Sequence, residues 1–266
     1  MPNFLYLLPD LYVFFILVLF TISISTLFIF INKYFIYEKL HYKDNPTISS
    51  FCSVIGIIYG VLMGFLCLYL INNQDHASQY VQNEANATAN IYISSLWLPE
   101  PAKGKIQQDV KLYINEAINH EWPLMKQFKK IGYEGDRIIL SIANDLKSIK
   151  AQTNTDVAQL RALLTSINEL YNARHSRVDM SYNILPPELW EVILIGTILI
   201  IAINYAFRVN IYLHLFGTMT FAIMAASMLF LLVTLDTPFQ GEFVVTPRAL
   251  SDVLDLMQSI KPQDVK

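Results

Sequence analysis

Four long stretches without a charged residue constrain the fold of this chain more than any other feature of its sequence. A helix of about 20 residues crosses the ~30 Å hydrocarbon core of a bilayer. An ionised side chain at mid-bilayer costs at least about 2.5 kcal/mol, so such stretches are typical of lipid-facing helices. The four stretches are Leu11–Ile31, Phe51–Ile71, Val192–Phe207 and Leu215–Leu235. We predict a membrane-spanning helix from each, with Leu189 and Trp190 completing the third at the interface.

The order of these stretches predicts an all-α membrane protein whose four transmembrane helices are grouped two and two. Only 15% of the residues are charged, against about 25% in ordinary soluble domains. The predicted parts are a first hairpin over 1–71 (spans 11–31 and 51–71), a helical soluble domain inserted over 72–190, a second hairpin over 191–235 (spans 189–207 and 215–235) and a tail over 236–266. The alternative, a large soluble core of buried helices, does not account for four runs of this length.

Apolar residues recur at helical spacing through the inserted segment, and no run alternates with the period of a strand. The predicted faces are Ile106, Val110, Tyr113, Ile114 and Ala117; Ile139, Ile142, Ala143, Leu146 and Ile149; and Val157, Leu160, Leu164, Ile167 and Tyr171. Breaks are expected at Pro99 and Pro101, at Gly132–Gly135 and at Thr153–Thr155. No strong breaker separates 72–96 from the second span, so we expect that helix to protrude from the bilayer. A short amphipathic helix is expected after Thr246 and Pro247, packed on the domain or on a neighbouring subunit.

Lysine and arginine near the span ends predict the orientation in the membrane. Lys33, Lys39 and Lys43 lie between the first two spans, and Arg208 lies between the last two. Residues 1–10, 72–102, 178–191 and 236–247 contain neither residue type. We therefore expect a multi-pass protein of the cell inner membrane, with cytoplasmic short loops and with the soluble domain and both termini in the periplasm.

No motif of catalysis or cofactor binding is present in the sequence. It lacks a P-loop, Gly-x-Gly-x-x-Gly, Gly-x-Ser-x-Gly, His-Glu-x-x-His and Cys-x-x-Cys. We therefore predict no enzyme activity, no catalytic residue, no cofactor and no metal site, although an enzyme with an unfamiliar site stays open. The inserted domain is close to neutral and has no basic stripe, which argues against nucleic acid as a partner. Membrane lipid is the expected surrounding.

A tandem set of glycines marks one face of the second span. Gly56, Gly60 and Gly64 form two overlapping Gly-x-x-x-Gly units, and such positions let a second helix approach closely. The contact could lie within the monomer or between subunits of a homo-oligomer. Tyr59 is a polar candidate on the same span. No span has a charged residue between its ends, which argues against a pump but is compatible with a pore.

Glu84 lies on the otherwise small and apolar face of the helix that follows the second span. One interpretation is a solvated surface carboxylate. The other is an ion-pair partner for Arg174 or Arg177, near the end of the last soluble helix. A buried pair of this kind would make Glu84, Arg174 and Arg177 domain or gate contacts.

Five blocks of residues occur together in one order along the chain. They are Ile55–Phe65; Val81–Ala85 leading to Leu98-Pro99; Tyr113 with Glu121-Trp122-Pro123; Leu163–Arg177 reaching Leu185–Trp190; and Leu235-Asp236-x-Pro238-Phe239-x-Gly241. The ordered set resembles the bacterial bestrophin-like domain family, membrane proteins of unknown function that are distantly similar to bestrophin anion channels.

The resemblance implies kinship with oligomeric anion channels that have four main spans and a helical domain on one side. The Pro238-Phe239-x-Gly241 piece is similar to the Asn-Pro-Phe-Gly segment after the last span of bestrophins. We count Asp236, Pro238 and Phe239 among the domain or gate contacts. Calcium-gated members carry an acidic run next, whereas this chain continues Glu242-Phe-Val-Val. One carboxylate does not supply the six to eight oxygens of a calcium site. The expected orientation is opposite to that of bestrophins, whose domain is cytosolic.

Two functions follow as hypotheses. The first is a homo-oligomeric channel-like protein that passes anions or small solutes along an axis lined by the second span. The alternative is a non-conducting membrane scaffold or sensor, whose helical domain binds a partner or an envelope component.

Overall fold

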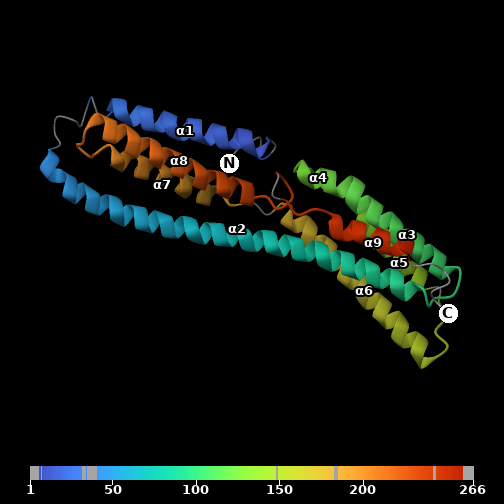
Figure 1. The fold of residues 1–266 in the computed structure, drawn as a ribbon. Coiled ribbons are helices and arrows are strands. Elements are labelled where there is room, and N and C mark those ends of the chain that lie inside the picture. The colour runs from blue at the N-terminus through green and yellow to red at the C-terminus, as the bar shows by residue number, and fades with distance from the viewer. Residues whose placement is uncertain are drawn as a thin grey trace. The chain divides into compact units, whose positions relative to one another are not determined.

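Every regular element in the described part of the chain is a helix (Figure 1). The computed structural model describes residues 6, 8–31, 34, 41–147, 149–182, 185–241 and 244–259. Lys33, Lys39 and Glu242, on which the predicted topology and calcium argument partly depend, lie outside these residues, as does the tail beyond residue 259. The chain divides into two compact units, which we call the apolar unit (Met1–Asn72, Ile184–Thr237 and Gly241–Phe243) and the polar unit (Asn73–Asn183, Pro238–Gln240 and Val244–Lys266).

The apolar unit contains the helices that are long and apolar enough to cross a membrane. They are α1 (Asp10–Ile31), the first part of α2 (Asn45–Ser95), α7 (Pro187–Asn204) and α8 (Ile211–Leu235). The prediction of four spanning helices is confirmed at this level. Within this unit α1, α7 and α8 pack side by side (Figure 1). Large apolar side chains remain exposed on all four helices, as a lipid-facing surface requires, for example Phe65 and Phe216.

The second pair of spans differs from the prediction at its ends. α7 begins at Pro187 and ends at Asn204, short of the predicted end at Phe207. α8 begins at Ile211, because the Asn210 side chain accepts a hydrogen bond from the Tyr212 N–H and caps the helix. This cap falls before the uncharged stretch, so counting uncharged residues did not find it.

The second helix continues without a break well past the predicted span. α2 has 51 residues, and it contributes its first part to the apolar unit and its last part to the polar unit. The sequence predicts this continuity, because no strong helix breaker occurs over 72–96. Protrusion of this helix from a bilayer stays a prediction.

The polar unit is built from shorter helices around a shared apolar core. These are α3 (Ala102–Glu116), the π-helical turn η4 (Ala117–Glu121), α4 (Trp122–Lys126), α5 (Glu134–Leu146), α6 (Asn154–Met180) and α9 (Arg248–Ser259). The predicted breaks at Pro99 and Pro101 fall between helices. Those at Gly132–Gly135 and Thr153–Thr155 begin between helices, but Gly135 and Thr155 already lie in the first turns of α5 and α6. The short tail helix is also confirmed, and its Leu250 and Val253 join the core of this unit.

The predicted faces of α3 and α5 are largely correct, whereas that of α6 is wrong at three of its five residues. All five residues of the first predicted face are buried, four of them on α3 and Ala117 on η4. On α6, Val157, Leu164 and Tyr171 are exposed, and the buried face holds Leu163, Ser166, Ile167, Leu170, Ala173, Arg174 and Arg177. The apolar pattern pointed to the wrong face because the true one includes two buried arginines, which a count of apolar residues excludes.

Candidate functional site

The glycine face of α2 has no partner in the described part of the protomer. A Cβ atom added at Gly56, Gly60 or Gly64 would meet no other atom within 4 Å. Packing inside the monomer therefore does not explain these glycines. Packing between subunits stays a prediction. It requires an open glycine face on each protomer, and α2 has one.

Tyr59 lies on a different face of α2 and makes contacts inside the apolar unit. Its hydroxyl is 2.6 Å from the Thr197 Oγ1 and donates to the Ile193 carbonyl at 3.2 Å. A Cβ at Gly196 would fall 2.5 Å from the Tyr59 ring, so that ring needs a glycine on α7. The sequence interpretation placed Tyr59 with the glycines and missed Gly196, whose role depends on a contact between distant residues.

The largest cluster of buried charge lies in the core of the polar unit. Glu84 and Arg177 are both 0% exposed, so the interpretation of Glu84 as a solvated carboxylate is wrong. The Arg177 Nε donates to Glu84 Oε2 at 2.5 Å and its Nη2 donates to Oε1 at 2.9 Å. Tyr113, also buried, donates its hydroxyl to the same carboxylate. The pairing of Glu84 with Arg177 is thus present, and a gating role for it stays a prediction.

Glu121 joins the two arginines of α6. Arg177 Nη2 donates to Glu121 Oε2 at 2.6 Å, and Arg174 donates to Oε1 from Nε at 3.0 Å and from Nη2 at 2.7 Å. Arg174 also donates to Asp136 Oδ1 at 2.6 Å, and the His175 Nε2 lies 3.1 Å from that oxygen. Acidic and basic side chains therefore alternate from Glu84 through Arg177, Glu121 and Arg174 to Asp136 and His175. We call these six residues the ion chain.

Local backbone features place two members of the ion chain. Pro123 has no N–H to donate four residues back, and its ring would clash with the carbonyl there. The helix widens instead into the π-helical turn η4, in which the Trp122 N–H bonds the Ala117 carbonyl and which ends on Glu121. On α5, a Cβ at Gly135 would fall 2.4 Å from the Arg174 Nε and 2.7 Å from Glu121 Oε1. Position 135 must therefore be a glycine, so that the Arg174 guanidinium can lie against α5 and reach Glu121.

The pKa shifts of Glu121 and Arg177 favour their charged forms despite burial. Burial alone would raise the pKa of Glu121, but Arg177 and Arg174 outweigh it and hold that pKa below its usual value. Burial would likewise lower the pKa of Arg177, and the adjacent Glu84 carboxylate reverses the direction. The Arg177 guanidinium carbon also lies 5.0 Å from the centroid of the Trp122 ring. Glu84, Arg177, Glu121 and Arg174 thus each have a partner of opposite sign, which is the condition for retaining charges in a core.

Asp236 forms a separate buried corner in the apolar unit. It is 1% exposed, and its carboxylate accepts from the Tyr6 hydroxyl at 2.6 Å, the Leu185 N–H at 2.6 Å and the Trp190 Nε1–H at 3.3 Å. Burial raises the pKa of Asp236, and the three hydrogen bonds oppose that shift. The predicted contact residue therefore holds the ends of several segments of its own unit.

Pro238 and Phe239 belong to the polar unit. The Pro238 carbonyl accepts from the Val245 N–H at 2.9 Å, and the buried Phe239 ring meets the Trp122 ring edge to face at 5.7 Å. Of the six predicted contact residues, the structure brings Glu84, Arg174 and Arg177 into one cluster, and Phe239 packs on the Trp122 that faces Arg177. The sequence interpretation did not assign a role to Glu121 or Asp136, although Glu121 stands in one of the family blocks.

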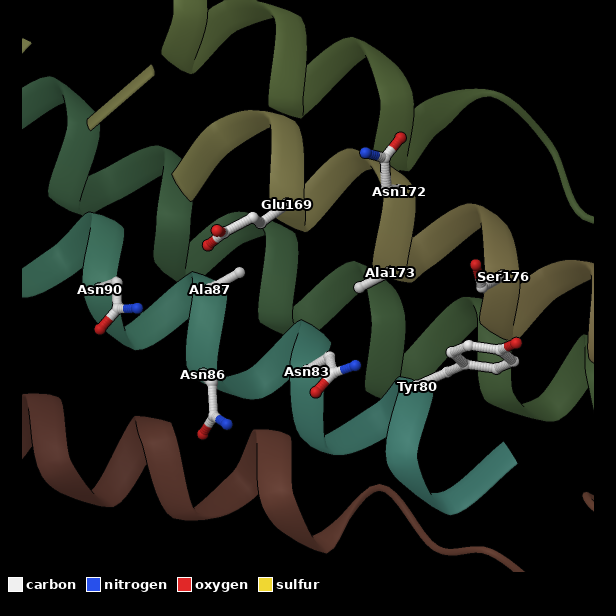
Figure 2. Close-up of a pocket in the computed structure, with 9 residues that line it drawn as sticks. All are labelled: Tyr80, Asn83, Asn86, Ala87, Asn90, Glu169, Asn172, Ala173 and Ser176. Carbon is white, nitrogen blue, oxygen red and sulfur yellow. The ribbon is translucent and has the colours of Figure 1, made fainter. Parts of the chain in front are cut away.

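A polar pocket of about 450 Å³ opens between α2 and α6 in the polar unit (Figure 2). Most of its lining side chains carry hydrogen-bonding groups, and two small residues face the space between the helices: Asn83, Asn86, Asn90, Asn172, Glu169, Ser176 and Tyr80, with Ala87 and Ala173. No sequence motif pointed to this site, since its residues come from two helices far apart in the chain.

Comparison with known proteins places this architecture among membrane proteins. No curated protein matches the chain. One solved structure, the crystal structure of a membrane protein, has the same fold with a TM-score of 0.64 and 13% sequence identity, covering 90% of this chain and 98% of the other. The sequence profile of the Bestrophin-like domain matches residues 19–250. These residues include α2, the ion chain and Asp236, and the chain therefore belongs to the Bestrophin-like domain family.

Proposed function

We propose that this protein is a homo-oligomeric channel-like protein of the inner membrane, which passes anions or small solutes along an axis lined by α2. The observation that carries the proposal is the open glycine face at Gly56, Gly60 and Gly64. A lipid-exposed helix gains nothing from three aligned glycines, whereas close packing of helices from several subunits uses them.

Two further observations support the proposal. The chain belongs to the Bestrophin-like domain family, whose name refers to channels. The four stretches that cross the hydrocarbon core contain no charged side chain that a proton-coupled pump would use. A pore can instead use apolar constrictions and backbone dipoles.

Flux through reconstituted protein tests this function. Purified protein in liposomes under a chloride gradient should release chloride faster than empty liposomes, and Gly60→Leu should reduce the release. Val61→Leu is the matched control, since its exposed side chain lies about 100° around the same helix. Absence of flux for chloride and for small neutral solutes, with correctly folded protein in the bilayer, would reject conduction.

The alternative is a non-conducting scaffold or sensor whose polar unit binds an envelope component. The pocket between α2 and α6 favours it, because it is large enough for a small ligand and is lined by hydrogen-bonding groups. A monomeric particle without flux would support this alternative.

A further inference from the structure

The polar pocket of Figure 2 has features of a binding site that the ion chain and the glycine face do not explain. We call it the asparagine groove, and define it by Asn83 and Asn90 of α2 and Asn172, Glu169 and Ser176 of α6. The buried Arg177–Glu84 ion pair joins the two helices, so the groove has a fixed frame. An adjoining cavity of about 430 Å³ shares Tyr80 and Ser176 with it and extends it toward Asp179.

The hydrogen-bonding groups in the groove are available. In the described part of the chain, the side chains of Asn83, Asn90, Asn172 and Glu169 make no hydrogen bond to another residue. All four are exposed at the rim, while Ala87 and Ala173 are buried between them. Figure 2 shows Asn83 and Asn90 on α2 and Glu169 and Asn172 on α6, the two helices that line the pocket. A ligand lying between the helices would meet both rows.

The side chains that line the groove argue against two classes of ligand. Pockets for apolar small molecules are lined mainly by hydrophobic side chains, and this one is not. Anion sites present arginine, lysine or converging N–H groups. Neither cavity is lined by a lysine, arginine or histidine among the described residues, whereas Glu169 and Asp179 contribute carboxylates about 15 Å apart along α6. Phosphates and carboxylates would be repelled.

The amide groups distinguish between two further classes of ligand, organic cations and neutral polyols. Each asparagine offers one acceptor and two donor hydrogens, and a hydroxyl group is likewise both donor and acceptor. An ammonium group can use only the oxygen of each amide and would leave the NH₂ groups unpaired. Hydroxyl groups pair with both ends of every amide, with Ser176 and with the Glu169 carboxylate. Tyr80 adds an aromatic ring at one end of the groove, a surface on which the C–H face of a sugar ring packs.

We propose that the asparagine groove binds a neutral saccharide, such as a short stretch of a glycan. This goes beyond conduction and does not depend on it, because the groove is complete within one protomer and contains no residue of the glycine face.

Calorimetry on the full chain in lipid nanodiscs tests the proposal, since glycoside detergents would themselves present a sugar to the groove. The probes are chitotriose and maltotriose, with spermidine and inorganic phosphate as comparison ligands. At least one saccharide should bind, and Asn83→Ala/Asn172→Ala should weaken it about tenfold or more, the loss expected for one to two hydrogen bonds. Asn115→Ala, an exposed asparagine of α3 whose amide bonds only within its own helix, should leave the affinity unchanged.

Three results would overturn the assignment. These are binding of neither saccharide at millimolar concentration, saccharide binding that the double variant leaves unaltered, and binding of spermidine without either saccharide. The double variant should have the melting temperature of the wild type. A loss of saccharide affinity can then be attributed to the removed amides rather than to misfolding. Because these variants leave Gly60 in place, chloride flux should persist in them, so failure of this proposal and failure of conduction are distinguishable.

Discussion

At the scale of single residues, burying the charges of the ion chain costs desolvation free energy, and contacts with oppositely charged side chains offset that cost. Transferring charges such as Glu84 and Arg177 from water to a core is unfavourable by several kcal/mol per ion. The structure offsets this by giving each guanidinium two carboxylates and by adding the Tyr113 hydroxyl to Glu84. Such a network contributes little net stability compared with an apolar core, but removal of one member leaves its partners buried and unpaired.

Arg177→Met should therefore destabilise the protein by about 3–5 kcal/mol, because Glu84 and one oxygen of Glu121 lose their partner in the core. Chemical denaturation of the detergent-solubilised protein measures the free energy of unfolding. The double variant Glu84→Gln/Arg177→Met should recover part of the loss, since the unpaired charge on Glu84 is removed.

The matched control is Arg137→Met, which breaks the exposed pair with Glu134 on α5. Its effect should stay within about 1 kcal/mol, as for other exposed ion pairs. Equal effects of the two arginine variants would show that the burial of Arg177 carries no energetic weight.

Asp236 predicts a pH dependence of the opposite sign to that of most carboxylates. Its pKa is raised in the folded protein, so between its unfolded and its folded pKa the folded state binds more protons than the unfolded chain. Stability should therefore fall as the pH rises through this window, which begins above the ordinary value of about 3.9. Thermal unfolding of Asp236→Asn across the same pH range should lack this component. A wild-type and a variant curve with the same pH slope would contradict the assignment.

At the scale of elements, α6 and the π-helical turn η4 determine where the charges meet. The turn ends on Glu121, and the buried face of α6 presents Arg174 and Arg177. Between them α5 passes close to the guanidinium of Arg174 at Gly135, where a side chain would collide with it.

Gly135→Ala should consequently destabilise the protein, although alanine is favoured over glycine in a helix by about 1 kcal/mol. The added Cβ would fall 2.4 Å from Arg174 Nε, so the arginine must leave its bond to Glu121. Gly132→Ala serves as the control, since a Cβ there meets no atom within 4 Å. A higher melting temperature for Gly135→Ala than for wild type would refute this account of the packing.

At the scale of the whole molecule, the described protomer leaves much of its apolar surface uncovered. The glycine face of α2 is one part of it, and exposed aromatic residues such as Phe65 and Phe216 are another. Lipid covers isolated apolar side chains well, but a flat glycine face is better covered by another helix.

Gly60→Leu should therefore shift the particle from an oligomer toward a monomer in detergent, because a branched side chain prevents close approach of the helices. Native mass spectrometry or light scattering reports the assembly, and Val61→Leu should leave it unchanged. An oligomer of the same size in the folded Gly60→Leu variant would exclude packing through this face.

The orientation in the membrane is a second prediction at this scale. Lys43 and Arg208 lie in the short loops, and the segments at the opposite span ends lack both residue types, so the positive-inside rule predicts a periplasmic C-terminus. An alkaline phosphatase fusion at the C-terminus should be active and a green fluorescent protein fusion dark. The reverse pattern would place the polar unit in the cytoplasm, as in bestrophins.

The sequence by itself determined the features that depend on local chemistry. Uncharged stretches predicted the four spanning helices because charge is costly in hydrocarbon, and prolines, glycines and the Thr153 region predicted the helix breaks because they act on the backbone where they stand. The glycine face and the pairing of Glu84 with an arginine were also within reach, since spacing and charge suggested them.

Only the tertiary structure decided which residues meet. The buried face of α6, the position of Glu121 between two arginines, the need for glycine at 135 and 196, and the asparagine groove all depend on contacts between helices that are distant in the sequence. The periodicity of apolar residues does not reveal these contacts, because arginine and asparagine are polar and their positions are interpreted as part of the solvent-exposed surface. Whether such a residue is buried or lines a pocket depends on which other residues the fold brings next to it.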